Sequence, residues 1–268
     1  MTVESVAGVW NTSAMPKLDT HPNGIPSWID VMVETEEQQQ ALMNFYTSLY
    51  GWSWDLGDEQ MGFYSIANSD GAPVMGLGRG PGSAGAMVPY FATDDINASA
   101  AKAAELGGTV FMGPMEVPEA GTMALVSDPT GAVHGLWQGG NFKGFGVAYE
   151  ANAPGWFDHA SSDPAAAAAY YQGLTGHSVI EPEPGMRVLT AGEQWFASVS
   201  ENQVADRPAA QWNSIYVVEK LEEARNKVRE LGGTIVLEEM PVPGSAISVF
   251  VEPVMNTAVT IMGAGSHE

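Results

Sequence analysis

Cysteine is absent from this chain of 268 residues, and basic residues are scarce. Without cysteine the chain has no disulfide bond, zinc–thiolate site, iron–sulfur cluster or thiol nucleophile. Lys and Arg number 10 against 32 Asp and Glu, which gives a formal net charge of −22. Because nucleic-acid affinity comes mainly from Lys and Arg that neutralise phosphates, the composition argues against a nucleic-acid partner. The acidic residues are spread evenly over both halves, which favours a role in solubility.

Long apolar runs are also missing. No stretch approaches the roughly 20 apolar residues that a membrane helix requires, and residues 1–25 lack the apolar segment of a signal peptide. We therefore predict a cytoplasmic protein with no membrane partner. With 45% hydrophobic residues, the chain is long enough to bury two cores of ordinary domain size.

The sequence contains one set of short motifs that occurs twice in the same order. The Trp-x-Asp segment at 28–30 returns at 156–158, 128 positions later. Leu-Gly-Gly-Thr at 106–109 returns at 231–234, 125 positions later, and a Met-x-Val-Pro segment follows each copy. A period of this length is a whole domain, so the matched segments indicate a tandem duplication.

Each half predicts two successive strand–helix–strands units. The first begins with an alternating strand at 28–34 and a helix at 36–49 that Gly51 ends. The second half repeats this order with a strand at 156–161 and an alanine-rich helix at 164–174. We predict an α+β fold of four βαβββ units. The domain boundaries follow: an N-terminal extension at 1–24, module 1 at 25–140, a linker at 141–153 and module 2 at 154–264.

The ordered motifs resemble one protein family. Trp-x-Asp is followed by Leu-Tyr-Gly-Trp at 49–52, Asp-Asp-Ile at 94–96, Leu-Gly-Gly-Thr, and Asp-Pro-Thr-Gly at 128–131. Together they resemble the vicinal oxygen chelate superfamily of glyoxalase I, the extradiol dioxygenases and the bleomycin-resistance proteins. Within it the chain is similar to tandem two-module actinobacterial proteins labelled glyoxalase-like. The resemblance implies that the four units pair into two modules, each an open curved mixed sheet around a cup.

Metal enzymes of this superfamily take His or Glu ligands from three strands of a module. Carried over by position, the ligand sites fall on Trp28, Val88 and Gly135 in module 1, and on Trp156, Asn213 and Val259 in module 2. Divalent metals need several oxygen or nitrogen donors, and of these six only Asn213 offers one. We therefore predict no metal site and no cofactor in either module.

Asp30 and Asp158 are the predicted catalytic residues. Each follows its Trp by two positions, so strand alternation points both side chains to one face, the face that lines the cup in the resembled fold. Desolvation raises the pKa of a carboxyl group in a partly apolar cavity, which suits a general acid or base. The alternative is structural: the carboxylate binds backbone amides or a neighbouring Trp N–H and holds the strand.

Further side chains are predicted to bind the substrate at the cups. They are Trp28, Met32, Tyr90, Trp137, Arg79, Trp156, Asn213 and Tyr216. Aromatic rings at such positions suit a flat apolar ligand, and they equally suit plain core filling. Arg79 lies in a glycine-rich segment, where we place it at the rim. Alternation puts His134 and His159 on the outer, helix-facing side; a register shift of one would bring them into the cups as acid–base groups.

Three functions are compatible with these features. The first is a metal-independent glyoxalase-like enzyme of lyase, isomerase or cyclase type, acting on a hydrophobic carbonyl-containing or polyketide-like molecule through Asp acid–base chemistry. The second is a non-catalytic protein that sequesters a small molecule, as in drug resistance. The third is a metal-dependent glyoxalase or dioxygenase. We favour the first, with module 1 as the working site, a hydrophobic or aromatic small molecule as partner, and a monomer or homodimer as the assembly.

Overall fold

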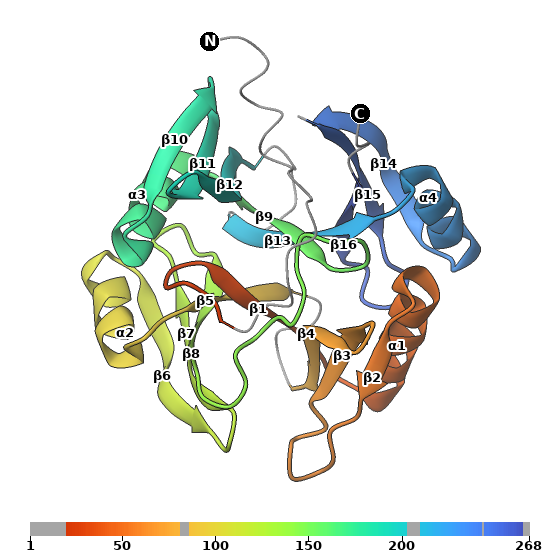
Figure 1. Ribbon diagram of the computed structural model, residues 1–268, viewed down its shortest axis with the longest axis horizontal. Helices are drawn as coiled ribbons and strands as arrows, with labels where there is room; N and C mark the ends of the chain where they lie inside the picture. Colours follow the sequence, from red (N-terminus) through yellow and green to blue (C-terminus); the bar gives the residue numbers. More distant parts are fainter. Residues whose placement is uncertain (1–19, 81–85, 203–209, 243, 265–268) are drawn as a thin grey trace.

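A computed structural model describes residues 20–80, 86–202, 210–242 and 244–264. In this part of the chain two eight-stranded mixed sheets are accompanied by four helices (Figure 1). The strand orders are β2-β3-β4-β1-β5-β8-β7-β6 and β10-β11-β12-β9-β13-β16-β15-β14. Adding eight to each label of the first sheet gives the second, so the duplication read from the sequence is a duplication of structure. The fold is α+β, as predicted.

The first sheet and its helices span residues 26–139. Its strands are β1 (Pro26–Val33), β2 (Ser53–Asp55), β3 (Ser65–Ser69), β4 (Ala72–Arg79), β5 (Met87–Ala92), β6 (Thr109–Val117), β7 (Gly121–Ser127) and β8 (Val133–Gly139). Its helices are α1 (Glu36–Tyr50) and α2 (Ile96–Glu105). No helix or strand lies between residues 140 and 153.

The second sheet repeats the arrangement. Its strands are β9 (Pro154–Ser161), β10 (Ser178–Glu183), β11 (Met186–Ala191), β12 (Gln194–Glu201), β13 (Ala210–Val218), β14 (Thr234–Val242), β15 (Ser245–Val251) and β16 (Ala258–Gly263). Its helices are α3 (Pro164–Thr175) and α4 (Leu221–Glu230). None of the described helices is both long and apolar enough to cross a membrane.

The first helix of each module has strong local signals at both ends. The Thr35 hydroxyl accepts from the Gln38 backbone N–H while the Gln38 side chain accepts from the Thr35 backbone, a capping box that starts α1. Gly51 ends α1 in the left-handed region at φ 75°. In α3, Asp163 caps the N-terminus, Pro164 follows it, and Gly176 ends the helix at φ 72°.

The two modules share one hydrophobic core. One side of each sheet faces the other sheet. This side carries Ile29 and Phe91 in module 1 and Phe157 and Trp212 in module 2, all at most 4% exposed. Helix α1 lies beside α4, and α2 lies beside α3, so each first helix also meets the other module (Figure 1). The ring of Phe45 on α1, for example, lies 5.9 Å from that of Phe250 on β15. The opposite side of each sheet therefore points away from this core.

A polar contact joins the modules inside that core. His159 Nε2 donates to the Asp128 carboxylate over 2.6 Å, and neither side chain is exposed to solvent. The Tyr171 hydroxyl donates to the same carboxylate oxygen over 3.1 Å. Burial alone raises the pKa of Asp128, but the hydrogen bonds from His159 and Thr130 outweigh it and hold that pKa at about 2. Asp128 is therefore an anion at neutral pH, with its donors drawn from both modules.

His134 lies close to this contact and is fully buried. Its Nε2 and the hydroxyl of Tyr170, which α3 supplies from module 2, share a hydrogen bond of 3.1 Å. Burial lowers the pKa of His134 to about 4, since the charged imidazolium loses its hydration there. The folded protein thus favours the neutral ring, whereas the unfolded chain protonates it at the ordinary histidine pKa of 6.5.

This difference predicts a pH dependence of stability. Because the folded pKa lies below the unfolded one, the contribution of His134 is fully present above about pH 6.5 and is lost as the pH falls towards 4. At about 1.4 kcal/mol per pKa unit, the loss amounts to about 3 kcal/mol. Urea unfolding between pH 7 and pH 4 measures it. The variant His134→Gln, which keeps a polar group towards Tyr170, is expected to flatten this part of the curve; an unchanged slope contradicts the assignment.

Candidate functional site

The cup face of each sheet, defined here as the side turned away from the shared core, carries several of the predicted site residues. In module 1, Trp28 on β1 pairs with Tyr90 on β5. Asp30 pairs with Val88 on β5 and with Gly76 on β4. Cross-strand partners share a face of the sheet, so Trp28, Asp30 and Tyr90 meet on the cup face.

Asp30 is held there by three side-chain donors. The Trp28 indole N–H donates to Asp30 Oδ1 over 3.0 Å, and the Tyr64 hydroxyl donates to the same oxygen. Tyr90 supplies a third hydrogen bond to the carboxylate. The Trp28 N–H also lies 2.7 Å from the Tyr64 hydroxyl oxygen. Trp28 therefore does hold Asp30, as the structural alternative expects, but two phenolic hydroxyls are added to it.

Two strand glycines make room for the two tyrosines. A Cβ on Gly76 would lie 1.7 Å from the Tyr64 hydroxyl oxygen, and a Cβ on Gly135 would lie 2.0 Å from Tyr90 Cδ1. Each ring therefore lies against bare backbone. Tyr64 is a site residue that the sequence prediction missed. A glycine inside a strand often marks close approach of another group, so Gly76 and Gly135 were the available signals.

Burial sets the protonation of these groups. It raises the pKa of Asp30 above the ordinary 3.8, although the hydrogen bonds from Tyr64, Tyr90 and Trp28 oppose the shift. Burial and the neighbouring carboxylate raise the pKa of Tyr64 and of Tyr90 well above 10. Both tyrosines therefore remain hydroxyl donors at any physiological pH, and Asp30 is the group that can exchange a proton.

The remaining module 1 residues surround this array. The Trp137 N–H donates to the Phe142 carbonyl over 3.1 Å, and the Phe142 ring packs edge-on against Trp28 at 4.8 Å. Met32 is half-buried, and its sulfur lies 2.8 Å from where a Gly78 Cβ would be.

Arg79 does not lie at a cup, which corrects the sequence prediction: it ends β4 paired with the core-side residue Val33, and its guanidinium contacts α1. It donates to Gln39 Oε1 over 2.6 Å and to Glu36 over 3.3 Å, and it lies 4.3 Å above the Phe63 ring. Its charge is therefore largely matched within the protein.

Module 2 presents its aspartate differently. The hydroxyls of Ser198 and Ser200 on β12 donate to Asp158 over 2.6 and 3.1 Å. The Trp156 N–H donates to the Ser198 hydroxyl over 2.8 Å, and that hydroxyl in turn donates to the carboxylate. Asn213 pairs with Asp158 from the neighbouring strand β13. Burial raises the pKa of Asp158, and the two serines oppose the shift.

Tyr216 does not lie at a cup, which corrects the sequence prediction. Its side chain is fully buried in the shared core, 5.4 Å from the Tyr50 ring and 5.5 Å from the Trp52 ring. Tyr216 lies three residues after Asn213 on β13, so strand alternation puts the two side chains on opposite faces, and Tyr216 shares the core side with Trp212. His134 and His159 lie on the core side, as alternation predicted, and neither enters a cup.

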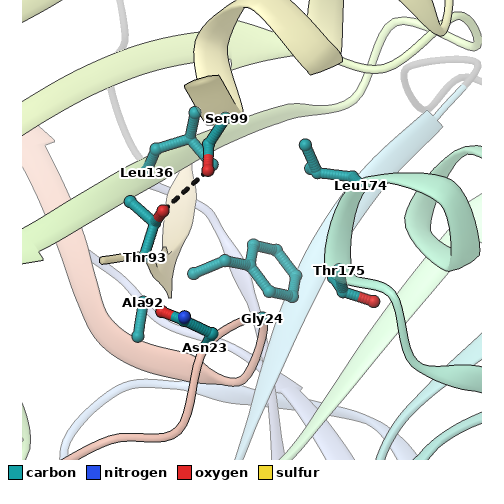
Figure 2. A pocket seen from close by; sticks show the side chains of 9 residues that line it. Asn23, Gly24, Ala92, Thr93, Ser99, Leu136, Leu174 and Thr175 are labelled. Atoms are coloured by element: carbon teal, nitrogen blue, oxygen red, sulfur yellow. Dashed lines mark hydrogen bonds between the residues drawn. The ribbon is translucent and has the colours of Figure 1, made fainter. Parts of the chain in front are cut away.

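A hollow of about 200 Å³ lies elsewhere, between the start of β1, the end of β5, α2 and the end of α3 (Figure 2). It is lined by Asn23, Gly24, Phe91, Ala92, Thr93, Ser99, Leu136, Leu174 and Thr175. Its hydroxyl groups are partly paired with each other, since Thr93 and Ser99 share a hydrogen bond of 2.6 Å. None of the lining residues titrates near neutral pH, so this hollow offers no acid–base group.

Comparison with known proteins places the chain in a family. It is 31% identical to CFP32 of Mycobacterium tuberculosis, a protein that carries a glyoxylase name, over 85% of this chain and 90% of that protein. It is 27% identical to the anthracycline biosynthesis protein DnrV of Streptomyces peucetius, over 86% and 90% of the two chains. No protein-family model matches the chain.

Solved structures agree on the fold. A 2,2',3-trihydroxybiphenyl 1,2-dioxygenase from Sphingomonas wittichii superposes with a TM-score of 0.65 at 14% identity, covering 91% of both chains. A Mn(II)-bound glyoxalase from Novosphingobium aromaticivorans gives 0.67 at 14% identity, covering 91% of this chain and 83% of that one. The chain belongs to the vicinal oxygen chelate superfamily. It is a tandem, glyoxalase-like member with two modules.

The metal of this superfamily does not fit the residues of module 1. At the three ligand positions that the resemblance implies, Trp28 uses its N–H as a donor, Val88 has no donor atom, and Gly135 is covered by the Tyr90 ring. In module 2, Trp156 and Val259 likewise offer no ligand atom. Among the residues that the structure describes, no three His, Asp or Glu side chains gather closely enough to hold a metal ion. We derive no chemistry through a metal.

The contact between Gly135 and Tyr90 gives a prediction about packing. Gly135→Ala forces the Tyr90 ring to move, and overpacking of this kind costs about 1–3 kcal/mol. In a Tyr90→Ala background the same change is expected to cost less than about 0.5 kcal/mol, since the clash is gone. Urea unfolding of the four proteins in this double-mutant cycle measures both costs. Gly113→Ala on β6, where a Cβ would meet nothing within 4 Å, is the matched control; equal costs in both backgrounds contradict the packing described.

Proposed function

We propose that the protein is a metal-independent glyoxalase-like enzyme that moves a proton on a hydrophobic, carbonyl-containing small molecule, with Asp30 as the acid–base residue. The observation that carries this proposal is the buried Asp30 carboxylate on the cup face of module 1, with its raised pKa and its ring of Tyr64, Tyr90 and Trp28 donors. A carboxyl group whose pKa is raised towards the working pH is suited to proton transfer.

The array suggests how a proton would be moved. Asp30 as a carboxylate takes a proton from the carbon next to the substrate carbonyl, and negative charge develops on the carbonyl oxygen. Once Asp30 is protonated, it no longer needs every donor that held it as an anion. The Tyr64 hydroxyl, which donates to Asp30 in the free protein, is then free to donate to the developing oxyanion. Return of the proton from Asp30 to the same or another carbon completes an isomerisation, or precedes loss of a leaving group in a lyase.

The rest of the cup face supports an apolar substrate body. Gly135 pairs with Tyr90 on one side and with Leu125 on the other, and Leu125 pairs with Met112. Two residues further along β8, and on the same face, Trp137 pairs with Met123, which pairs with Met115 on β6. These two rows carry no ionisable side chain apart from the Tyr90 hydroxyl. The flexible thioethers adapt to apolar ligands of varied shape.

The named relatives fit this reading. CFP32 carries the name of a glyoxylase and DnrV that of an anthracycline biosynthesis protein, which supports chemistry on a small carbonyl compound of polyketide-like character.

The alternative is sequestration without turnover. It is supported by Trp28, which holds Asp30 as a structural role requires. The two functions differ in whether a bound ketone is changed, and this decides the experiment.

Proton transfer is measured with 2-tetralone, an apolar ketone whose acidic protons exchange slowly with D2O. We expect the protein to accelerate this exchange, followed by proton NMR, and Asp30→Asn to lower the rate by on the order of 100-fold or more. Tyr64→Phe is expected to cost about 10- to 100-fold, since one oxyanion donor is lost. The rate is expected to rise with pH through the raised pKa of Asp30, so its acid limb lies above pH 3.8.

Asp158→Asn in module 2 is the matched control and is expected to leave the exchange unchanged. If 2-tetralone quenches tryptophan fluorescence but its protons do not exchange faster, the protein is a binder and the enzymatic proposal is wrong. If Asp158→Asn abolishes exchange while Asp30→Asn does not, the working site is module 2.

A metal-independent reaction is expected to be insensitive to metal chelation. Dialysis against EDTA is expected to leave the exchange rate unchanged, because Asp30 moves the proton and a tyrosine hydroxyl, with no metal ion, donates to the developing oxyanion. Elemental analysis of the purified protein accompanies the assay. A stoichiometric divalent metal whose removal stops exchange and whose return restores it would show that the enzyme is metal-dependent.

A further inference from the structure

The two cup faces differ in polarity at matched positions around their aspartates, although both also carry apolar residues. In module 1 the row across β4, β1 and β5 through Asp30 reads Gly76, Asp30, Val88. In module 2 the row across β12, β9 and β13 through Asp158 reads Ser198, Asp158, Asn213. The backbone pairing is the same in both, so the difference lies in the side chains alone.

The next row shows the same contrast. In module 1, Gly78 pairs with Met32. In module 2, Ser200 and Gln211 pair with Ala160 from its two sides. Where module 1 has a long apolar side chain beside a glycine, module 2 has a small alanine between a hydroxyl and an amide. Ala160 is thus bordered by Ser200 and Gln211 on the flanking strands and by Asp158 two positions before it.

These polar groups are accessible and have spare hydrogen-bonding capacity. Asp158, Ser200, Gln211 and Asn213 are each half-buried. The Gln211 side chain donates to Asn213 Oδ1 over 2.9 Å, which fixes both amides in the plane of that contact. Within the described part of the chain, no partner for the Asn213 amide nitrogen is found. An accessible amide held in one orientation is ready to donate to a ligand.

The spacing of the groups suits a small polyol. Neighbouring strands lie about 4.8 Å apart and alternate residues on one strand about 7 Å apart. The four polar side chains Asp158, Ser200, Gln211 and Asn213 therefore cover an area of about 10 by 7 Å, close to that of a six-membered sugar ring. They offer hydroxyls, amides and one carboxylate, which together can match the alternating donors and acceptors of neighbouring hydroxyl groups.

We propose that the cup face of module 2 is a second binding site, for an uncharged polyhydroxylated ring such as a pyranoside. Asp158 and Asn213 accept from and donate to adjacent ligand hydroxyls, and Ser200 and Gln211 border the ring over Ala160. An anionic sugar is disfavoured, because Asp158 lies at the centre of the site in a chain of net charge −22. This site has no part in the proton transfer proposed for module 1.

The test uses the full-length protein and methyl α-D-pyranosides of the gluco, galacto and manno series. Saturation-transfer NMR detects weak binding, and titration calorimetry gives the affinity. We expect at least one of the three to bind. The double variant Asn213→Val and Ser200→Gly places the module 1 residues at the matched positions, and we expect it to weaken that binding at least 10-fold.

Asp30→Asn in module 1 is the control and is expected to bind the pyranoside as the parent protein does. The methyl uronide of whichever series binds carries an added carboxylate, and it is expected to bind at least 10-fold more weakly than the uncharged pyranoside of that series. Far-UV circular dichroism and a thermal melt establish that the double variant is folded. If none of the three pyranosides binds, or if the folded double variant binds as tightly as the parent, the proposal is wrong. The 2-tetralone assay is unaffected by either outcome, so the two proposals fail separately.

Discussion

The back-to-back packing of the two sheets is the constraint on which the rest of the molecule depends. Each sheet buries one side against the other module, and the Asp128–His159 hydrogen bond of 2.6 Å lies within that contact. A buried carboxylate needs such donors because it has lost its water. Since one side of each sheet is used for this core, only the other side remains for a ligand. The two cup faces therefore point in opposite directions, and each module must assemble a site from its own strands.

Duplication gave both modules the same frame, and side-chain changes gave them different chemistry. Both keep Trp-x-Asp on the first strand, and in both the aspartate lies at the cup face with a raised pKa. In module 1 glycines on β4 and β8 admit two tyrosine rings above the backbone. In module 2 serines replace the β4 glycines, and their hydroxyls donate to the carboxylate. Because hydrogen-bond partners help to set how a carboxylate behaves, the two matched aspartates have different surroundings, and this difference is the basis of our separate proposals for the two modules.

Much of the fold was accessible from local signals. The helices begin at or next to the predicted residues, because caps such as Thr35 and Asp163 and the glycine stops act within a few positions of the chain. Strand alternation placed Asp30, Asp158, His134 and His159 on the correct faces. The placement of Tyr216 at a cup was wrong, because it lies three residues after Asn213 on β13 and alternation puts the two side chains on opposite faces.

The sequence by itself determined the duplication, the α+β units and the strand face that each aspartate shares with its Trp. All of these follow from residue identity and spacing. Only the tertiary structure decided what surrounds each aspartate: that Tyr64, 34 positions after Asp30, donates to it, that Arg79 is already paired, and that His159 reaches Asp128 in the other module. These contacts join residues that are distant in the chain, and their geometry depends on how the sheets curl and pack.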